Sequence, residues 1–265
     1  MRPVAAISRR AALNALCAAV AAASALRPRI EVAAAAAASD YMQPDASRLR
    51  TLTQQLAAIP RRRNYKALPM ILTKPDQWDS EALDVVLAYD GPRQLFDTTR
   101  LAGGWINQIR NTLNAQVFSL QRPNFLCAAA PHGGAALALF TQDAWNKYKL
   151  AQQTDGAFKE NSFLADPVFP LSDVGDPGNA QGLYSDAGNF VPTLQKRGVV
   201  FLGCHNAIWE LAAALLKAGV NPDRLTHEGL AAELTNSLIP GVVSTPGNEA
   251  MIGKFQEAGF VYSYT

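Results

Sequence analysis

Cys204 and its two neighbours are the residues whose types and spacing best suit covalent chemistry in this chain. Cys204, His205 and Asn206 follow the apolar run GVVFLG (198–203), which predicts a buried strand, and they precede a segment that predicts a helix over 206–218. Open α/β folds bind ligands at the carboxyl ends of their strands. A helix N-terminus there offers unpaired backbone N–H groups that stabilise a thiolate.

These surroundings predict that Cys204 is a nucleophile or sulfur carrier. His205 would be its catalytic partner if the ring turns toward the sulfur, and Asn206 would be a binding residue. The alternative is that Cys204 packs the end of the strand as a small apolar residue.

Cys127 and His132, in the stretch CAAAPHGG, form a second group of candidate binding residues. Their spacing lacks the short paired motif of a metal site. Three arrangements stay open: Cys127, His132, Cys204 and His205 converge on a metal, the two cysteines form a disulfide, or they have unrelated packing roles. The loose spacing favours packing, so we expect no metal and no cofactor.

Two loops at predicted strand ends carry further polar groups. Asp90 follows ALDVVLAY (82–89), a short apolar run that predicts a strand, and is a candidate binding residue. The turn VVSTPGN (242–248) could place polar groups at the same ligand crevice as Cys204, at the carboxyl ends of the strands. For both loops an ordinary structural connection is the simpler interpretation.

Several well-known motifs are missing from the sequence. It contains no P-loop, no G-x-G-x-x-G fingerprint, no G-x-S-x-G elbow and no C-x-x-C pair. Nucleotide hydrolysis, Rossmann-type hydride transfer and α/β-hydrolase chemistry are therefore disfavoured.

The elements that must position these residues alternate between strands and helices, most clearly after residue 197. Strands are predicted at 82–89, 116–120, 198–203, 241–245 and 260–264, with 125–130 either a strand or the entry to a helix. Helices are predicted at 47–59, 93–113, 135–149, 206–218, 222–236 and 247–258. This order implies right-handed parallel crossovers, and hence a layered α/β fold with a mostly parallel sheet flanked by helices.

The first 38 residues have the order of a signal peptide. Arg9-Arg10 precede an apolar run over 11–26 that is short for a membrane span, and small residues offer cleavage after Ala25 or, preferably, after Ala38. The segment predicts export to the periplasm by the twin-arginine pathway. A retained N-terminal anchor is the alternative.

Removal of that segment changes the charge balance of the chain. The sequence holds 24 Lys and Arg against 22 Asp and Glu, but five of these arginines and one glutamate lie in residues 1–38, which leaves 19 against 21. A slightly acidic protein of this kind does not favour nucleic acid or, after signal removal, a membrane as a partner.

The remaining chain divides into an N-terminal extension, 39–80, and an α/β domain, 81–265, with an irregular insertion at about 150–190. The insertion is rich in Gly, Asp, Asn and Pro, which is typical of a functional or disordered loop. Its aromatic residues favour a packed covering loop.

The C-terminal part of the chain resembles the DsrE/DsrF-like family. The resemblance lies in GVVFLGCHNAIWELAAALLKAG (198–219) and GVVSTPGNEAMIGKFQEAGFVYSY (241–264), whose helix ends near the family pattern Q-x-x-G-[FY]-x-Y, and more weakly in 83–120. It implies a compact, often oligomeric α/β fold. In several members sulfur is carried as a persulfide on the cysteine that Cys204 matches.

The resemblance predicts a periplasmic DsrE-like protein that handles sulfur or thiols through Cys204, with Cys127 as a resolving partner. Its partner would be a small molecule or a sulfur donor, and the chain would form a homo-oligomer. The alternative is a non-catalytic ligand-binding or assembly module, in which the loop 158–190 covers a pocket or a subunit contact. Whether the chain is an enzyme stays open between the two.

Overall fold

The computed structural model describes residues 40–265, whose strands form a single five-stranded parallel sheet. The predicted α/β class is confirmed. The sheet has the order β4-β3-β2-β1-β5, and its strands are β1 Arg93–Thr98, β2 Leu126–Pro131, β3 Val200–Cys204, β4 Val243–Thr245 and β5 Val261–Tyr264. The predicted signal segment lies outside the described residues. Within them, no helix has the length and apolar character needed to cross a membrane.

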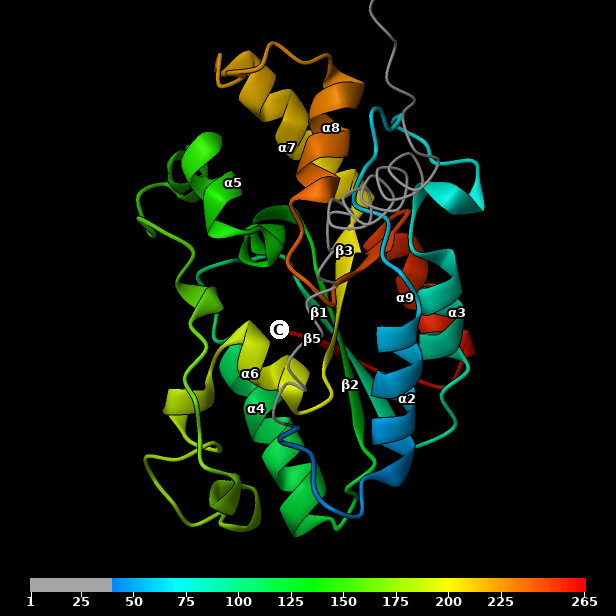
Figure 1. Cartoon of the computed structure of the whole chain (residues 1–265), viewed down its shortest axis with the longest axis vertical. Helices are drawn as coiled ribbons and strands as arrows, with labels where there is room; N and C mark the ends of the chain where they lie inside the picture. Colours follow the sequence, from blue (N-terminus) through cyan, green and yellow to red (C-terminus); the bar gives the residue numbers. More distant parts are fainter. Residues whose placement is uncertain (1–39) are drawn as a thin grey trace, which may run out of the picture. The chain divides into compact units, whose positions relative to one another are not determined.

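Helices cover both faces of the sheet (Figure 1). Because side chains alternate along a strand, Phe96 and Phe201 pack with α4, α6 and α7, whereas Leu95 and Leu202 pack with α2, α3 and α9. Both faces are therefore buried, as expected for parallel strands. The helices are α2 Ser47–Ala58, α3 Ser80–Leu87, α4 Trp105–Asn114, α5 Gln142–Lys147, α6 Val191–Lys196, α7 His205–Lys217, α8 His227–Asn236 and α9 Asn248–Glu257.

The direction of the strand connections reverses after β4. From β1 to β4 each strand lies beside its predecessor, and the chain returns through α4, α6 and α7 on one face of the sheet. From β4 the chain runs through α9 on the other face and reaches β5 at the far edge. The connections that leave β3 and β4 thus diverge to opposite faces, which is the arrangement that opens a ligand crevice in α/β sheets.

The predicted strand at 82–89 is wrong, because these residues form most of α3. Ala82 and Val86 are buried and Asp84 is exposed, so the apolar residues lie on one side of a helix. A short apolar run fits a buried strand or a helix equally well, and the tertiary structure decides between them.

The helix predicted at 93–113 is wrong in its first part, because Arg93–Thr98 is the central strand β1. Its pairing with β2 and β5 on its two sides outweighs a polar beginning in the sequence. The helical part, α4, begins at Trp105, directly after Gly104.

Two further predictions fail in the middle of the chain. The stretch 116–120 is not a strand but continues α4 as a wider π-helical turn over Ala115–Ser119. The helix predicted at 135–149 is divided into a 3-10 segment, Gly133–Leu139, and α5. Phe140 interrupts it, because its backbone is extended and bridges to Leu238. At 125–130 the strand alternative is the correct one.

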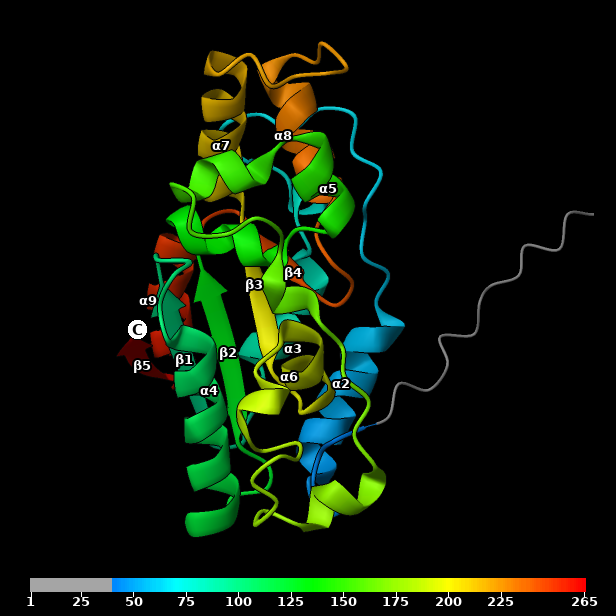
Figure 2. The same ribbon diagram turned by 90° about the vertical axis from the view of Figure 1, so that its left-hand side faces the viewer.

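The irregular insertion is packed onto the face that carries α4 and α6, which Figure 2 shows toward the viewer. It contains only short 3-10 turns. The ring of Phe163 lies 5.8 Å from that of Trp105, and Phe169 and Tyr184 share a cluster with Tyr41. Phe163 therefore packs against the main hydrophobic core, and Phe169 and Tyr184 are buried in a smaller cluster.

The helix predicted at 47–59 is confirmed as α2, whose N-cap residue is Ala46. Leu49 and Leu52 are buried against the sheet together with α3 and α9. Within the described residues, the segment predicted as an extension thus supplies part of one helical layer.

Candidate functional site

The carboxyl edge of the sheet holds a pocket of about 390 Å³. Cys204, His132 and Glu249 line it from the ends of β3 and β2 and from the start of α9. Asn206 and the exposed side chain of Met70 lie on its wall as well. The pocket lies where the connections that leave β3 and β4 run to opposite faces of the sheet. Two of the predicted site residues, Cys204 and His132, line it together.

Cys204 occupies the N-cap position of α7, and its sulfur accepts hydrogen bonds from backbone N–H groups of two helices. Ala207 of α7 donates to Sγ at 3.5 Å, and Asn248 of α9 donates at 3.3 Å. These donors favour the thiolate, but the residue is only 1% exposed, and burial raises the pKa of the thiol overall. At neutral pH the resting group is therefore a thiol whose anion, once formed, meets several backbone donors.

Asn248 holds the beginning of α9 against this sulfur. Its buried side-chain amide donates to the carbonyls of Pro131 at 3.1 Å and Leu202 at 3.2 Å, and it accepts from the Thr245 hydroxyl at 2.8 Å. The amide thus joins the ends of β2, β3 and β4 through side-chain hydrogen bonds. Of the turn 242–248, Asn248 therefore contacts Cys204, while the neighbouring Glu249 is the residue that lines the pocket.

His132 is held between two carboxylates at the rim of the pocket. Its Nε2 lies 2.8 Å from Asp97 Oδ1, and its Nδ1 lies 3.3 Å from Glu249 Oε1. Tyr262 donates to the second oxygen of Asp97 at 2.7 Å, and this bond raises the pKa of Tyr262 to about 12. The imidazole is oriented by a buried carboxylate, as in general acid–base sites.

Asp97 and Glu249 are functional candidates that the sequence analysis missed, and Asn248 entered it only as the last residue of the turn 242–248. Asp97 lies in a stretch predicted as helical, although the polar residues at the end of RQLFDT are the signal that a strand end would give. Asn248 and Glu249 begin a correctly predicted helix whose approach to Cys204 depends on the sheet order.

The expected role of His205 is contradicted. Its Nε2 lies 2.8 Å from the carbonyl oxygen of Pro69, so the hydrogen bond of the ring goes to the segment before α3 and not to Cys204. Burial lowers the pKa of His205, which keeps the ring neutral. Adjacent residues at a strand-to-helix junction point in different directions, and His205 packs while Cys204 faces the pocket.

Cys127 is neither a disulfide partner nor a resolving thiol for Cys204. The two cysteines of the described residues are free, and Cys127 is fully buried in β2 on the face covered by α4. Ala128 pairs with Val200, so Cys204 lies about five strand positions farther along, roughly 16 Å at 3.3 Å per residue. A disulfide needs Cα atoms within about 7 Å. Burial raises the pKa of Cys127 far above its ordinary range.

The alternative metal site with two cysteines and two histidines fails on the same separation. Across residues 40–265, His, Cys, Asp and Glu side chains form no group of three or more with the geometry to hold a metal ion.

Asp90, predicted as a binding residue, does not line the Cys204 pocket. The apolar run before it is α3, so Asp90 precedes β1 and lies at the opposite edge of the sheet from Cys204. Its carboxylate is solvent-exposed and lies 3.6 Å from Arg48. An exposed pair of this kind contributes little to stability.

Comparison of the chain with protein-family models, with curated proteins and with solved structures found no match. The DsrE/DsrF-like resemblance therefore stays a prediction from the sequence, and the geometry around Cys204 is the stronger basis for a functional proposal.

Proposed function

We propose that the chain is an exported, DsrE-like protein that accepts and passes on sulfur through Cys204. One observation carries the proposal: the sulfur of Cys204 accepts hydrogen bonds from backbone N–H groups of α7 and α9, and it lines a pocket together with His132 and Glu249. Such donors stabilise a developing thiolate or persulfide anion, as oxyanion-hole donors stabilise oxygen anions. Export and family membership rest on the sequence of residues 1–38 and 198–264.

The proposed reaction needs no oxidant or reductant. The Cys204 thiolate attacks the outer sulfur of a donor persulfide, R–S–SH, while the S–S bond of the donor breaks. The electron pair leaves with the inner sulfur, which takes up a proton as R–SH, and Cys204 becomes a persulfide. The proton released from the Cys204 thiol has two acceptors in the pocket, the imidazole of His132 and the carboxylate of Glu249.

Intact-protein mass spectrometry tests this proposal. After incubation with glutathione persulfide, the wild-type protein should gain about 32 Da, and a thiol acceptor should remove the added sulfur. In protein without residues 1–38, which contain the third cysteine, Cys17, Cys204→Ser should gain nothing, whereas the matched variant Cys127→Ala should load like the wild type. An unloaded wild type, or equal loading of Cys204→Ser, would overturn the proposal.

The exposed edge of β5 favours a second candidate function, an assembly module. Among residues 40–265, β5 is the last strand at one side of the sheet and pairs with β1 alone. Its side chains Val261 and Tyr264 are 65% and 56% exposed. A second copy of the chain is the proposed occupant. Sedimentation would give a dimer for the wild type and a monomer for Val261→Lys, and a wild-type monomer would exclude this function.

A further inference from the structure

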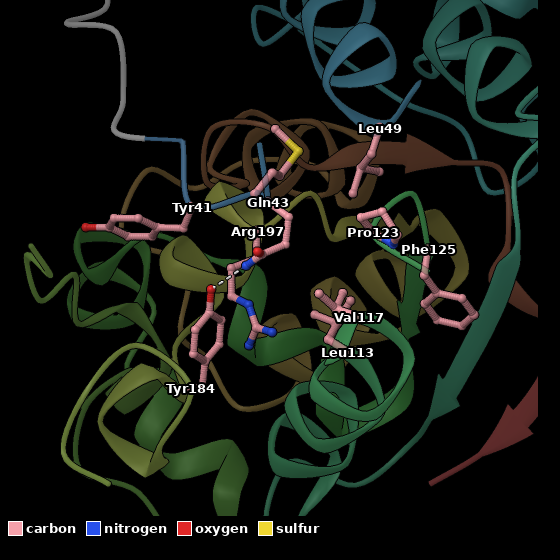
Figure 3. Close-up of a pocket in the computed structure, with 10 residues that line it drawn as sticks. Tyr41, Gln43, Leu49, Leu113, Val117, Pro123, Phe125, Tyr184 and Arg197 are labelled. Atoms are coloured by element: carbon pink, nitrogen blue, oxygen red, sulfur yellow. Dashed lines mark hydrogen bonds between the residues drawn. The ribbon is translucent and has the colours of Figure 1, made fainter. Parts of the chain in front are cut away.

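A small cavity lies beneath the irregular insertion, between α2, α4 and the segment that leads into β3 (Figure 3). About 20 Å³ is open to the centre of a water-sized sphere, which is room for one or two waters or a single small ion. Leu49, Leu113, Val117 and Phe125 supply apolar walls. The charged group at its wall is Arg197.

The guanidinium of Arg197 is buried with only part of its hydrogen-bonding capacity satisfied. The residue is 5% exposed, its Nη2 donates to Asn114 Oδ1 at 2.7 Å, and its carbon lies 4.8 Å from the ring centroid of Tyr184. Its Nη1 has no acceptor among residues 40–265. Figure 3 shows the group between the ring of Tyr184 and the side chains of Leu113 and Val117.

The charge of Arg197 is also unbalanced. The second buried cation of this region, Arg110, is paired with Asp186, and no carboxylate contacts Arg197 in the described part of the chain. Burial lowers the pKa of Arg197 to about 10, so the group still carries its charge at neutral pH. A buried charge without a partner is strongly destabilising, and an apolar cavity beside it is where a counter-ion would fit.

We infer that this cavity binds a small monovalent anion, of the charge and size of chloride, against Nη1 of Arg197. The small volume favours a monatomic anion over sulfate or phosphate. The bound anion would tie the insertion, through Tyr184, to α4. The site does not depend on Cys204, because Arg197 precedes β3 and Cys204 ends it.

Thermal unfolding of the full chain at constant ionic strength tests the inference. Replacing sodium gluconate by sodium chloride from about 1 to about 300 mM should raise the Tm of the wild type saturably by roughly 3–6 °C, with bromide acting similarly. The Arg197→Gln variant should lose this response. The matched variant Arg63→Gln, which removes a guanidinium already paired with Asp79, should keep it.

A second variant covers the case in which Arg197→Gln does not fold. Val117→Met keeps the guanidinium and fills the cavity, so its Tm should no longer depend on chloride. If the Tm of the wild type is the same in chloride as in gluconate at every concentration, the cavity holds water and the inference is wrong. A chloride response that survives in Val117→Met would equally exclude this cavity as the site.

Discussion

Cys204 and Cys127 differ little in exposure, 1% against 0%. They differ in whether the surrounding groups stabilise a thiolate. Cys204 ends a strand, accepts two backbone N–H groups and lines a pocket with His132 and Glu249. Cys127 is the second residue of β2, near the amino end of the strand, and packs among apolar side chains of α4 and its neighbours. Exposure alone would class both as packing residues. The position along the strand decides whether a thiolate can be stabilised, because Cys204 at the carboxyl end meets free helical N–H groups and Cys127 near the amino end does not.

Alkylation of the native protein should separate the two thiols most strongly. Iodoacetamide should modify Cys204 through the pocket at least about a thousandfold faster than Cys127, which is reached only by unfolding of the sheet. Peptide mass spectrometry over a time course measures both rates. Denatured protein, in which both cysteines label equally, is the control, and equal rates in the native state would remove the distinction.

The pH dependence of that reaction is set by the direction of the pKa shift. Because burial raises the pKa of Cys204, its thiolate is the minor form at pH 7, and its fraction grows about tenfold per pH unit. Between pH 7 and pH 9 the alkylation rate should therefore rise by roughly a hundredfold. A plateau near pH 7 would show instead that the backbone donors outweigh burial.

The contacts of Asn248 provide a third test of the Cys204 surroundings. Asn248→Ala leaves the carbonyls of Pro131 and Leu202 and the hydroxyl of Thr245 without this partner, and should lower the free energy of unfolding by about 2–3 kcal/mol. Thr245→Val, which removes one of these bonds, should cost about 1 kcal/mol. Urea unfolding measures both, and a loss below about 0.5 kcal/mol for Asn248→Ala would contradict the assigned role.

Serine substitutions compare the polarity of the two cysteine sites directly, with the smallest expected effect, through the free energy of unfolding. Cys127→Ser places a hydroxyl in an apolar layer and should cost about 1–2 kcal/mol. Cys204→Ser puts a favoured N-cap residue at the start of α7 and should change stability by less than about 0.5 kcal/mol. If urea unfolding gives the same loss of free energy of unfolding for both variants, the surroundings of Cys204 are not more polar than those of Cys127.

The sequence was most informative where apolar strands are bounded by glycine and proline, as in 198–203, 241–245 and 260–264. Such a run, followed by an amphipathic segment, has one favourable local solution. It was least informative at 82–98, where an apolar helix precedes a strand with a polar start. The two differ in which partners they find in the folded sheet, and no local pattern contains that information.

By itself, then, the sequence determined the α/β class, the last three strands and the position of Cys204 between a strand and a helix. Only the tertiary structure decided that Asp97 and Glu249 meet His132, that His205 turns toward Pro69, and that Cys127 lies far from Cys204. The physical reason is that backbone propensity and apolar periodicity act over a few neighbouring residues. Side chains from separate strands meet only through strand order and register.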